Sequence, residues 1–262
     1  MIDLHIHVLP GLDDGPSELD DAVRMCRMCE QEGILTLVAT PHVIPGLYET
    51  TRDRVLAAIA SLQGALRAES SSVRVLPGAD IRVEPDLLSG LISKRICTIA
   101  DNGVYVLLEV PETVAGLELV RLVSGLRTKG LRPIVSHPER SRAFQADVRL
   151  LYNLVHSDVL LQLTAASLLG SFGKEVMDFS KRLLEHGLVH ILASDAHSPT
   201  ERPPGLAKAV EKAAEIIGEE EACALVTKIP EAVVKAEPVR IPLPRQWKEP
   251  KKLRLIRWVM GS

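Results

Sequence analysis

Side chains that bind metal ions recur in this sequence near the ends of short apolar runs. His5 and His7 lie one residue apart in the opening run IDLHIHV. Side chains alternate along a strand, so both imidazoles would point to the same face. Asp13 and Asp14 follow in the next loop, and further His, Asp and Glu residues end or follow later runs: His42, Asp80, Glu109, His137, Asp195 and His197. Mixed imidazole and carboxylate ligands suit Zn, Mn or Fe rather than a thiolate site.

The runs that must position these residues alternate with helical patterns, which predicts an α/β fold with a parallel sheet. We expect strands at 2–8, 34–40, 73–83, 104–110, 132–137, 159–164 and 189–194. Helices are expected near 18–32, 50–68, 115–129, 145–156, 173–186 and 205–217. A closed barrel is the economical arrangement because it leaves no sheet edges, and its active site lies at the carboxyl ends of the strands.

In such a barrel, most of the strands deliver His, Asp or Glu to one rim. Carboxylates gathered there without counter-charge would be costly, and divalent cations remove that cost. There are enough ligands for more than one ion. Neighbouring ions can activate a bridging hydroxide and hold the oxygens of a phosphoryl group.

The composition limits the other functions. A chain of 262 residues with net charge −3 gives no support for nucleic-acid binding. We find no signal peptide and no long apolar window, so we expect no transmembrane span and a cytoplasmic protein.

The four cysteines predict neither a disulfide framework nor a cysteine-dependent phosphatase. None of them is followed six residues later by the arginine that such an enzyme needs. Cys26 and Cys29 form a CxxC pair that could be a redox or zinc pair. Together with Ala22 and Met25, however, they follow the core stripe of an amphipathic helix, which we favour.

The composition changes after about residue 236, so we expect a body at 1–236 and a basic extension with Pro and Trp at 237–262. From Arg240 to Arg257 the extension holds seven Lys or Arg residues and one Glu. It is interpreted as a solvated tail or as a segment docked on its own barrel. The alternative is contact with a partner subunit, an acidic protein or a membrane surface.

Seven blocks in order resemble the PHP (polymerase and histidinol phosphatase) metallophosphoesterases. Within that family they are most similar to the bacterial protein-tyrosine phosphatases of capsule and exopolysaccharide operons, the CpsB/YwqE type. The blocks are MIDLHIHVLPGLDDG, LVATPHVIPGLYET, PGADIRV, VLLEVPE, PIVSHPERSR, LTAASLLGSFGKE and ASDAHSPTERPP.

The resemblance implies a distorted TIM-like (β/α)7 barrel that holds three divalent ions, with manganese expected and iron or zinc as alternatives. The first ion would be bound by His5, His7, Asp80 and Asp195, the second by Asp80, Glu109 and His137, and the third by Asp14, His42 and His197. Asp13 is the rival of Asp14. Arg140 and Arg202 match the family's phosphate-binding arginines, and His42 or His197 is a candidate general acid.

Three positions depart from the family pattern. Asp80 stands where the family has Glu, Val43 where a second His is common, and Thr164 where many relatives have Asn. The shorter Asp80 could alter metal spacing, and the departures together bear on substrate preference rather than on the fold.

By resemblance the substrate is phosphotyrosine on a protein, and the partner is a bacterial tyrosine kinase in capsule or exopolysaccharide regulation. Two other functions stay open. One is a PHP phosphoesterase for a small phosphate such as histidinol phosphate, and the other is a non-catalytic binding module. Whether the chain forms a homo-oligomer also stays open.

Overall fold

The computed structural model describes residues 1–84, 87–114, 116–240 and 242–247. Its strands are parallel and form two sheets, of three strands in the order β1-β2-β4 and of six in the order β3-β5-β6-β7-β8-β9. Their bounds are β1 Ile2–Ile6, β2 Thr36–Ala39, β3 His42–Val43, β4 Arg74–Pro77, β5 Asp80–Arg82, β6 Tyr105–Glu109, β7 Arg132–Ser136, β8 Leu160–Thr164 and β9 Ile191–Ala193. The predicted α/β class with a parallel sheet is confirmed.

Two stretches of chain pass from one sheet to the other. β2 leads into β3, and β4 leads into β5, each after only two residues. The single strand predicted at 73–83 is therefore wrong, because it is broken at Gly78 and Ala79. A Cβ at Gly78 would lie only 2.7 Å from Val38 Cγ1 on β2, so glycine allows the chain after β4 to pass this close to β2.

Backbone hydrogen bonds also link β1 to the segment after β9. The Asp195 N–H donates to the His5 carbonyl at 2.8 Å, and the His7 N–H donates to the Ala196 carbonyl at 2.9 Å. The end of β1 and the segment after β9, which both carry predicted ligands, are thereby held side by side.

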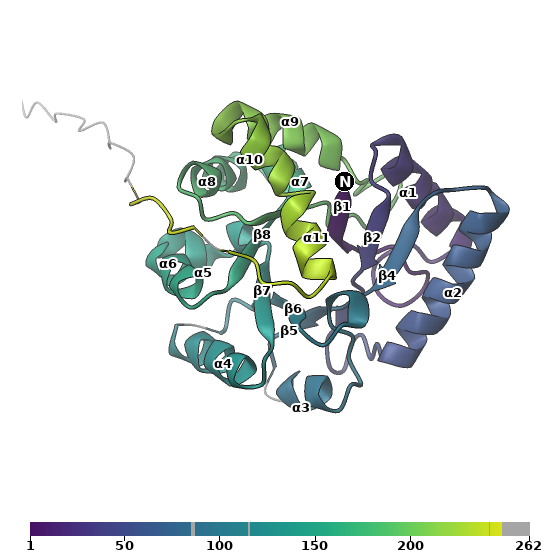
Figure 1. Cartoon of the computed structure of the whole chain (residues 1–262), viewed down its shortest axis with the longest axis horizontal. Coiled ribbons are helices and arrows are strands. Elements are labelled where there is room, and N and C mark those ends of the chain that lie inside the picture. The colour runs from purple at the N-terminus through teal and green to yellow at the C-terminus, as the bar shows by residue number, and fades with distance from the viewer. Residues whose placement is uncertain (85–86, 115, 241, 248–262) are drawn as a thin grey trace, which may run out of the picture.

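Helices surround the strands (Figure 1). Those longer than one or two turns are α1 Leu19–Gln31, α2 Arg52–Ala68, α4 Leu117–Thr128, α6 Arg149–His156, α8 Lys174–Glu185 and α9 Leu206–Ile217. The shorter ones are α3 Leu87–Ile92, α5 Arg142–Ala146, α7 Ala165–Leu168, α10 Glu219–Ala224 and α11 Lys228–Val234. The helix predicted near 145–156 is in fact the pair α5 and α6. No helix in the described part of the chain is long and apolar enough to span a membrane.

The apolar side chains between helices and strands form the core. Cys26 and Cys29 on α1 are fully buried in it beside Met25, as free thiols. Their burial in the core confirms the predicted packing role of the CxxC pair. The same burial raises the pKa of the Cys26 thiol to about 12 and raises that of Cys29 as well, which disfavours the reactive thiolate.

The described part of the C-terminal segment lies against the body (Figure 1). The Tyr105 hydroxyl donates to the Glu237 carbonyl at 2.7 Å and accepts from the Val239 N–H at 3.2 Å. Further along, the Arg182 guanidinium lies 4.0 Å from the Trp247 ring centroid. Residues 248–262, which carry most of the basic charge of the predicted extension, lie outside the described residues.

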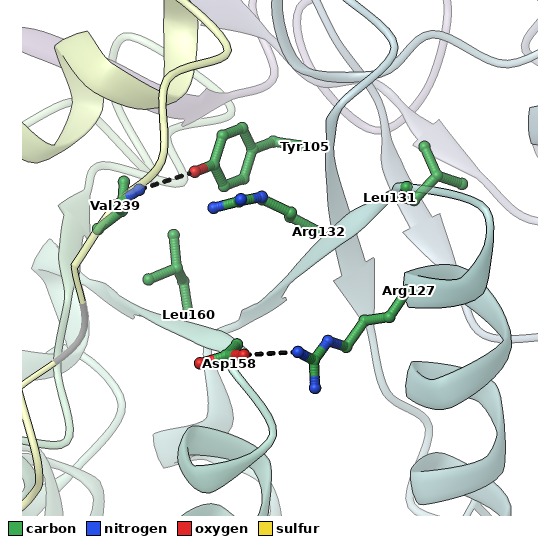
Figure 2. Close-up of a pocket in the computed structure, with 8 residues that line it drawn as sticks. Tyr105, Arg127, Leu131, Arg132, Asp158, Leu160 and Val239 are labelled. Carbon is green, nitrogen blue, oxygen red and sulfur yellow. Dashed lines mark hydrogen bonds and ion pairs between the residues drawn. The ribbon is translucent and has the colours of Figure 1, made fainter.

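Figure 2 shows a cavity of about 440 Å³ at the amino ends of β6, β7 and β8, the end opposite to the predicted site. Val239 closes one side of it, and the Arg127–Asp158 ion pair, with its atoms 2.5 Å apart, lies on another. The metal-capable residues named above are not among its lining residues.

Candidate active site

The predicted ligands gather at one rim, at or just beyond the carboxyl ends of β1, β2, β4, β6, β7 and β9. His5 belongs to β1 and His7 follows it, His42 begins β3, and Asp80 begins β5. The others end or follow strands β6, β7 and β9: Glu109, His137, Asp195 and His197. Three groups place their ligand atoms within 4.8 Å of one another: His7, Asp14, His42 and His197; His5, His7 and Asp80; and His42, Asp80 and Glu109.

The two histidines of the opening strand face each other through their Nε2 atoms. His5 Nδ1 lies 2.8 Å from Gln162 Oε1, and His7 Nδ1 lies 2.6 Å from Asp13 Oδ2. Both acceptors are oxygens, so each Nδ1 carries the hydrogen and each neutral ring keeps its lone pair on Nε2. The two Nε2 atoms are only 3.0 Å apart, which requires a proton or a metal ion between them.

Carboxylates complete the surroundings of these two nitrogens. Asp195 Oδ1 lies 3.4 Å from His5 Nε2 and 3.6 Å from His7 Nε2. Asp80 Oδ2 lies 3.6 Å from His5 Nε2 on another side. Burial alone would raise the pKa of Asp80, but the facing His5, His137 and His42 hold it below its ordinary value. Burial would raise the pKa of Asp195 too, but His5 and Arg140 hold it well below its ordinary value, so both carboxylates are ionised.

Asp80 also reaches the second half of the cluster. Its Oδ2 lies 3.4 Å from His42 Nδ1 and 3.9 Å from His137 Nε2. His42 Nδ1 is in turn 3.9 Å from Glu109 Oε2. His42 thus stands between two groups, whereas the resemblance assigned it to the third ion alone. His137 lies at the edge of this ligand cluster. Burial and the nearby Arg140 guanidinium lower its pKa to about 4.

The two neighbouring aspartates of the first loop have different surroundings. Asp13 accepts hydrogen bonds from the N–H groups of Gly15 and His42, each at 2.9 Å, as well as from His7 Nδ1. All of its oxygen atoms therefore face protein donors. Asp14 Oδ1 instead lies 3.4 Å from His197 Nε2 and 3.6 Å from His42 Nε2, and its side chain is 47% exposed.

Two arginines reach the same carboxylate from the cavity side. Arg140 Nη2 lies 2.8 Å and Arg202 Nη2 lies 3.0 Å from Asp195 Oδ2. Both line a cavity of about 380 Å³ together with Asp14, His42, Glu109 and His137. An anion that entered this cavity would meet two guanidinium groups beside the imidazole and carboxylate cluster.

The donor set fits divalent cations. The buried atoms of the cluster that have no hydrogen-bond partner among the described residues include Asp80 Oδ2, His42 Nδ1, Glu109 Oε2 and His197 Nε2. Buried polar atoms are normally paired, so a concentration of unpaired nitrogen and carboxylate atoms needs a ligand. Two of the residues also hold left-handed backbone conformations, His137 at φ 33° and Asp195 at φ 52°.

Several residues that the sequence interpretation missed support the cluster. Gln162 fixes the His5 ring, and the only signal for it is an amide inside the apolar run VLLQLT. Asp3 accepts from the N–H groups of His5 at 3.2 Å and Ser194 at 3.1 Å, and burial raises its pKa to about 6. Glu139 is buried beside Arg140 and accepts from the Thr164 N–H at 3.2 Å, with a pKa that burial raises to about 7.

Comparisons with known proteins agree with this description. Residues 1–235 match the model of the family described as capsular polysaccharide synthesis, CpsB/CapC. The tyrosine-protein phosphatase YwqE of Bacillus subtilis (strain 168) is 37% identical over 198 residues, 76% of this chain and 78% of that protein. The tyrosine-protein phosphatase CpsB of Streptococcus agalactiae is 26% identical over 240 residues, 90% of this chain and 98% of that protein.

Solved structures show the same likeness. A crystal structure from the work on YwqE of Bacillus subtilis and CpsB of Streptococcus pneumoniae, described as unique metal-dependent tyrosine phosphatases, superposes with a TM-score of 0.89 at 33% identity. The match covers 95% of this chain and 100% of that one. Histidinol phosphate phosphatase of Lactococcus lactis shares the fold alone, with a TM-score of 0.55 at 13% identity over 84% of this chain and 93% of that one.

Proposed function

Because this chain belongs to the CpsB/CapC family of capsular polysaccharide synthesis, we propose that it is a metal-dependent phosphatase that hydrolyses phosphotyrosine on proteins. One observation carries the proposal: the facing nitrogens of His5 and His7, 3.0 Å apart among carboxylates, lie beside two arginines that converge on Asp195. The names of its relatives support the choice of substrate.

We assign the ligands as the resemblance has them, for three divalent ions with manganese as the first choice and iron or zinc as alternatives. The sets are His5, His7, Asp80 and Asp195; Asp80, Glu109 and His137; and Asp14, His42 and His197. The position of His42 Nδ1 near Asp80 and Glu109 supports a further contact to the second ion. When bound, such ions supply a nucleophilic water at neutral pH and neutralise phosphoryl oxygens.

The protein's own groups then bind and orient the phosphate. Arg140 and Arg202 can exchange their shared partner, Asp195 Oδ2, for the phosphoryl oxygens, while Asp195 turns toward the cations. In the transition state the negative charge is spread over the equatorial oxygens, and two fixed guanidinium groups aimed at those oxygens stabilise it without having to reorganise.

The arginines also serve the leaving group better than the histidines do. His197 Nδ1 lies 2.9 Å from the Asp195 carbonyl, and its Nε2 faces Asp14. Both nitrogens of His42 likewise face carboxylates. A tyrosinate has a solution pKa of about 10 and needs charge stabilisation rather than a strong acid. We therefore favour an arginine, rather than His42 or His197, as the group that stabilises the negative charge on the oxygen of the leaving tyrosinate.

The finer structural predictions belong to the same proposal. The hydrogen bonds between β1 and the segment after β9 support a closed, distorted PHP-type barrel of seven (β/α) units. The family match ends at residue 235, which supports a catalytic body at 1–236 and an extension at 237–262. A bacterial tyrosine kinase stays the partner proposed from the resemblance, and the family description supports a setting in capsule synthesis. A cytoplasmic location and a homo-oligomer stay predictions.

Phosphate release tests the proposal. A phosphotyrosine peptide, a phosphoserine peptide and histidinol phosphate are compared after chelation and again with Mn, Zn, Fe, Co or Mg restored. We expect metal-restored release from phosphotyrosine, lost in Arg140→Ala and kept in Arg142→Ala, which removes an exposed arginine two residues away. Release only from histidinol phosphate would reassign the protein as a small-phosphate phosphoesterase. No release with any metal would leave the binding-module hypothesis.

A further inference from the structure

An exposed aromatic ring lies directly against one of the two arginines of the site. The Arg140 guanidinium carbon is 4.9 Å from the centroid of the Phe172 ring. The chain has three phenylalanines, and the other two, Phe144 and Phe179, are buried at 3% and 7% exposure. Phe172 is 37% exposed, so part of its surface stays open while Arg140 contacts the ring.

The loop that carries Phe172 holds it in place. The loop joins α7 to α8, and the Gly173 N–H donates to the Gly170 carbonyl at 3.0 Å across a tight turn. Both glycines have left-handed conformations, at φ 92° and φ 89°, which other residues rarely adopt. Leu169, which is 41% exposed, precedes the turn and packs near Gly205: a Cβ built on Gly205 would lie 3.8 Å from Leu169 Cδ1. Gly205 follows Arg202 by three residues. The loop therefore lies between the two arginine-bearing segments.

This placement suits an aromatic substrate group. An oxyanion bound by Arg140 lies beside the guanidinium, and its ester group extends from the same place. Aromatic rings attract each other at centroid separations of about 4.5–7 Å. Exposing a phenylalanine to water has no benefit for a phosphate site as such, because phosphate binds through charge and hydrogen bonds alone.

We propose that Phe172 is a specificity-determining residue whose ring receives the aryl group of a phosphate ester bound by Arg140. The inference rests on the proposed phosphatase function and adds the reason for a preference for aryl phosphates. Tyr48 is the nearest rival, because its ring stacks on His42 with centroids 5.9 Å apart and planes 14° apart. Tyr48 lines a separate cavity of about 170 Å³. Phe144 lines the site cavity but is almost fully buried, whereas the partly exposed ring of Phe172 contacts Arg140, the proposed phosphate-binding residue.

The test separates the aryl group from the oxyanion. KM is measured for phenyl phosphate and for a phosphotyrosine peptide, and the inhibition constant is measured for inorganic phosphate. In Phe172→Leu, which keeps apolar volume, we expect KM for both aryl substrates to rise by about five- to tenfold. The inhibition constant for phosphate should stay within about twofold, since that ligand has no ring. Phe172→Tyr should restore KM, and Leu243→Ala, which truncates a side chain 81% exposed elsewhere, should change neither.

Three results would overturn the inference. A parallel rise of KM and of the phosphate inhibition constant would show that Phe172 only holds Arg140. Unchanged constants would show that the ring is not used, and a selective rise in Tyr48→Ala alone would move the aryl contact to Tyr48. If the wild-type enzyme hydrolyses no aryl phosphate, the proposed function fails separately. Calorimetric binding of phenyl phosphate and of inorganic phosphate to wild type and Phe172→Leu then decides the inference by the same comparison.

Discussion

Asp13 and Asp14 are adjacent in sequence, yet the structure predicts opposite effects of replacing them with asparagine. Asp13 Oδ2 accepts from His7 Nδ1 and the His42 N–H, and Oδ1 accepts from the Gly15 N–H. An asparagine amide has one oxygen, so its best orientation keeps the first two hydrogen bonds and turns its NH₂ group toward the Gly15 N–H. One buried donor then faces another donor.

The cost of that mismatch can be worked out. Leaving one buried polar group unsatisfied costs about 1–3 kcal/mol. For a chain of this size that lowers the unfolding temperature of the metal-free protein by about 2–10 °C. The loss of the Asp13 charge behind the His7 ring should also weaken metal binding by about 10–100-fold, because such carboxylates orient and polarise the ligating imidazole. High metal concentrations should still restore every ion.

Asp14→Asn should behave in the reverse way. The half-exposed Asp14 has no backbone donor to lose, so the unfolding free energy of the metal-free protein should change by less than about 0.5 kcal/mol. One of the metal ions should be missing at any metal concentration, since a charged ligand beside His42 and His197 is gone. The assays are thermal unfolding after chelation and metal content by elemental mass spectrometry. A stable Asp13→Asn that lacks one ion at saturation, with full metal content in Asp14→Asn, would refute this reasoning.

Three further predictions use other parts of the molecule. Gln162→Leu removes the acceptor of His5 Nδ1 and should weaken metal binding by about 10–100-fold in a metal titration, whereas Gln162→Glu keeps an acceptor and should bind more tightly than the leucine variant. His190 accepts a hydrogen bond from the Leu161 N–H, and burial lowers its pKa from 6.5 to about 4. As the pH falls, His190 is therefore protonated in the unfolded chain before it is protonated in the folded one, which favours unfolding. Denaturant unfolding between pH 6.5 and 4 should therefore show up to about 3 kcal/mol more stability lost in the wild type than in His190→Asn. Alkylation of the folded enzyme should modify Cys223 and leave activity intact, because the other cysteines are buried, whereas chelation should abolish activity.

The site was predictable from the sequence where the strand itself decides the geometry. Period-two alternation places His5 and His7 on one face, and the carboxyl ends of parallel strands share one rim. Those two rules bring together residues as far apart as His5 and Asp195, whose side chains are 3.4 Å apart in the structure. The roles assigned to them came from the family resemblance and stay predictions.

Contacts that depend on the register between neighbouring strands could not be predicted from the sequence. Gln162 faces His5 from a strand that is buried at every position, so no alternation of polar and apolar residues marks this side chain. The residue pattern alone did not distinguish Asp13 from Asp14, because a loop has no period, and the choice of Asp14 as the ligand came from the resemblance. The hydrogen bonds to Asp13 show how their surroundings differ. The break at Gly78 was not predicted for a related reason, because it depends on the close approach of Val38 on another strand and not on a local pattern.

The His, Asp and Glu residues at the strand ends serve chemistry rather than folding. His137 and Asp195 adopt left-handed backbones, each at a local cost of order 1–3 kcal/mol, and Asp80 is fully buried as an anion. A parallel sheet gains nothing from these features, since apolar residues at the same strand ends would pack without unpaired atoms. Cations between the strand ends would offset the charge, and an anion between Arg140 and Arg202 would complete the pairing. In the proposed function the protein would therefore be most stable with both kinds of ligand present, which is the state in which a phosphate ester is bound for hydrolysis.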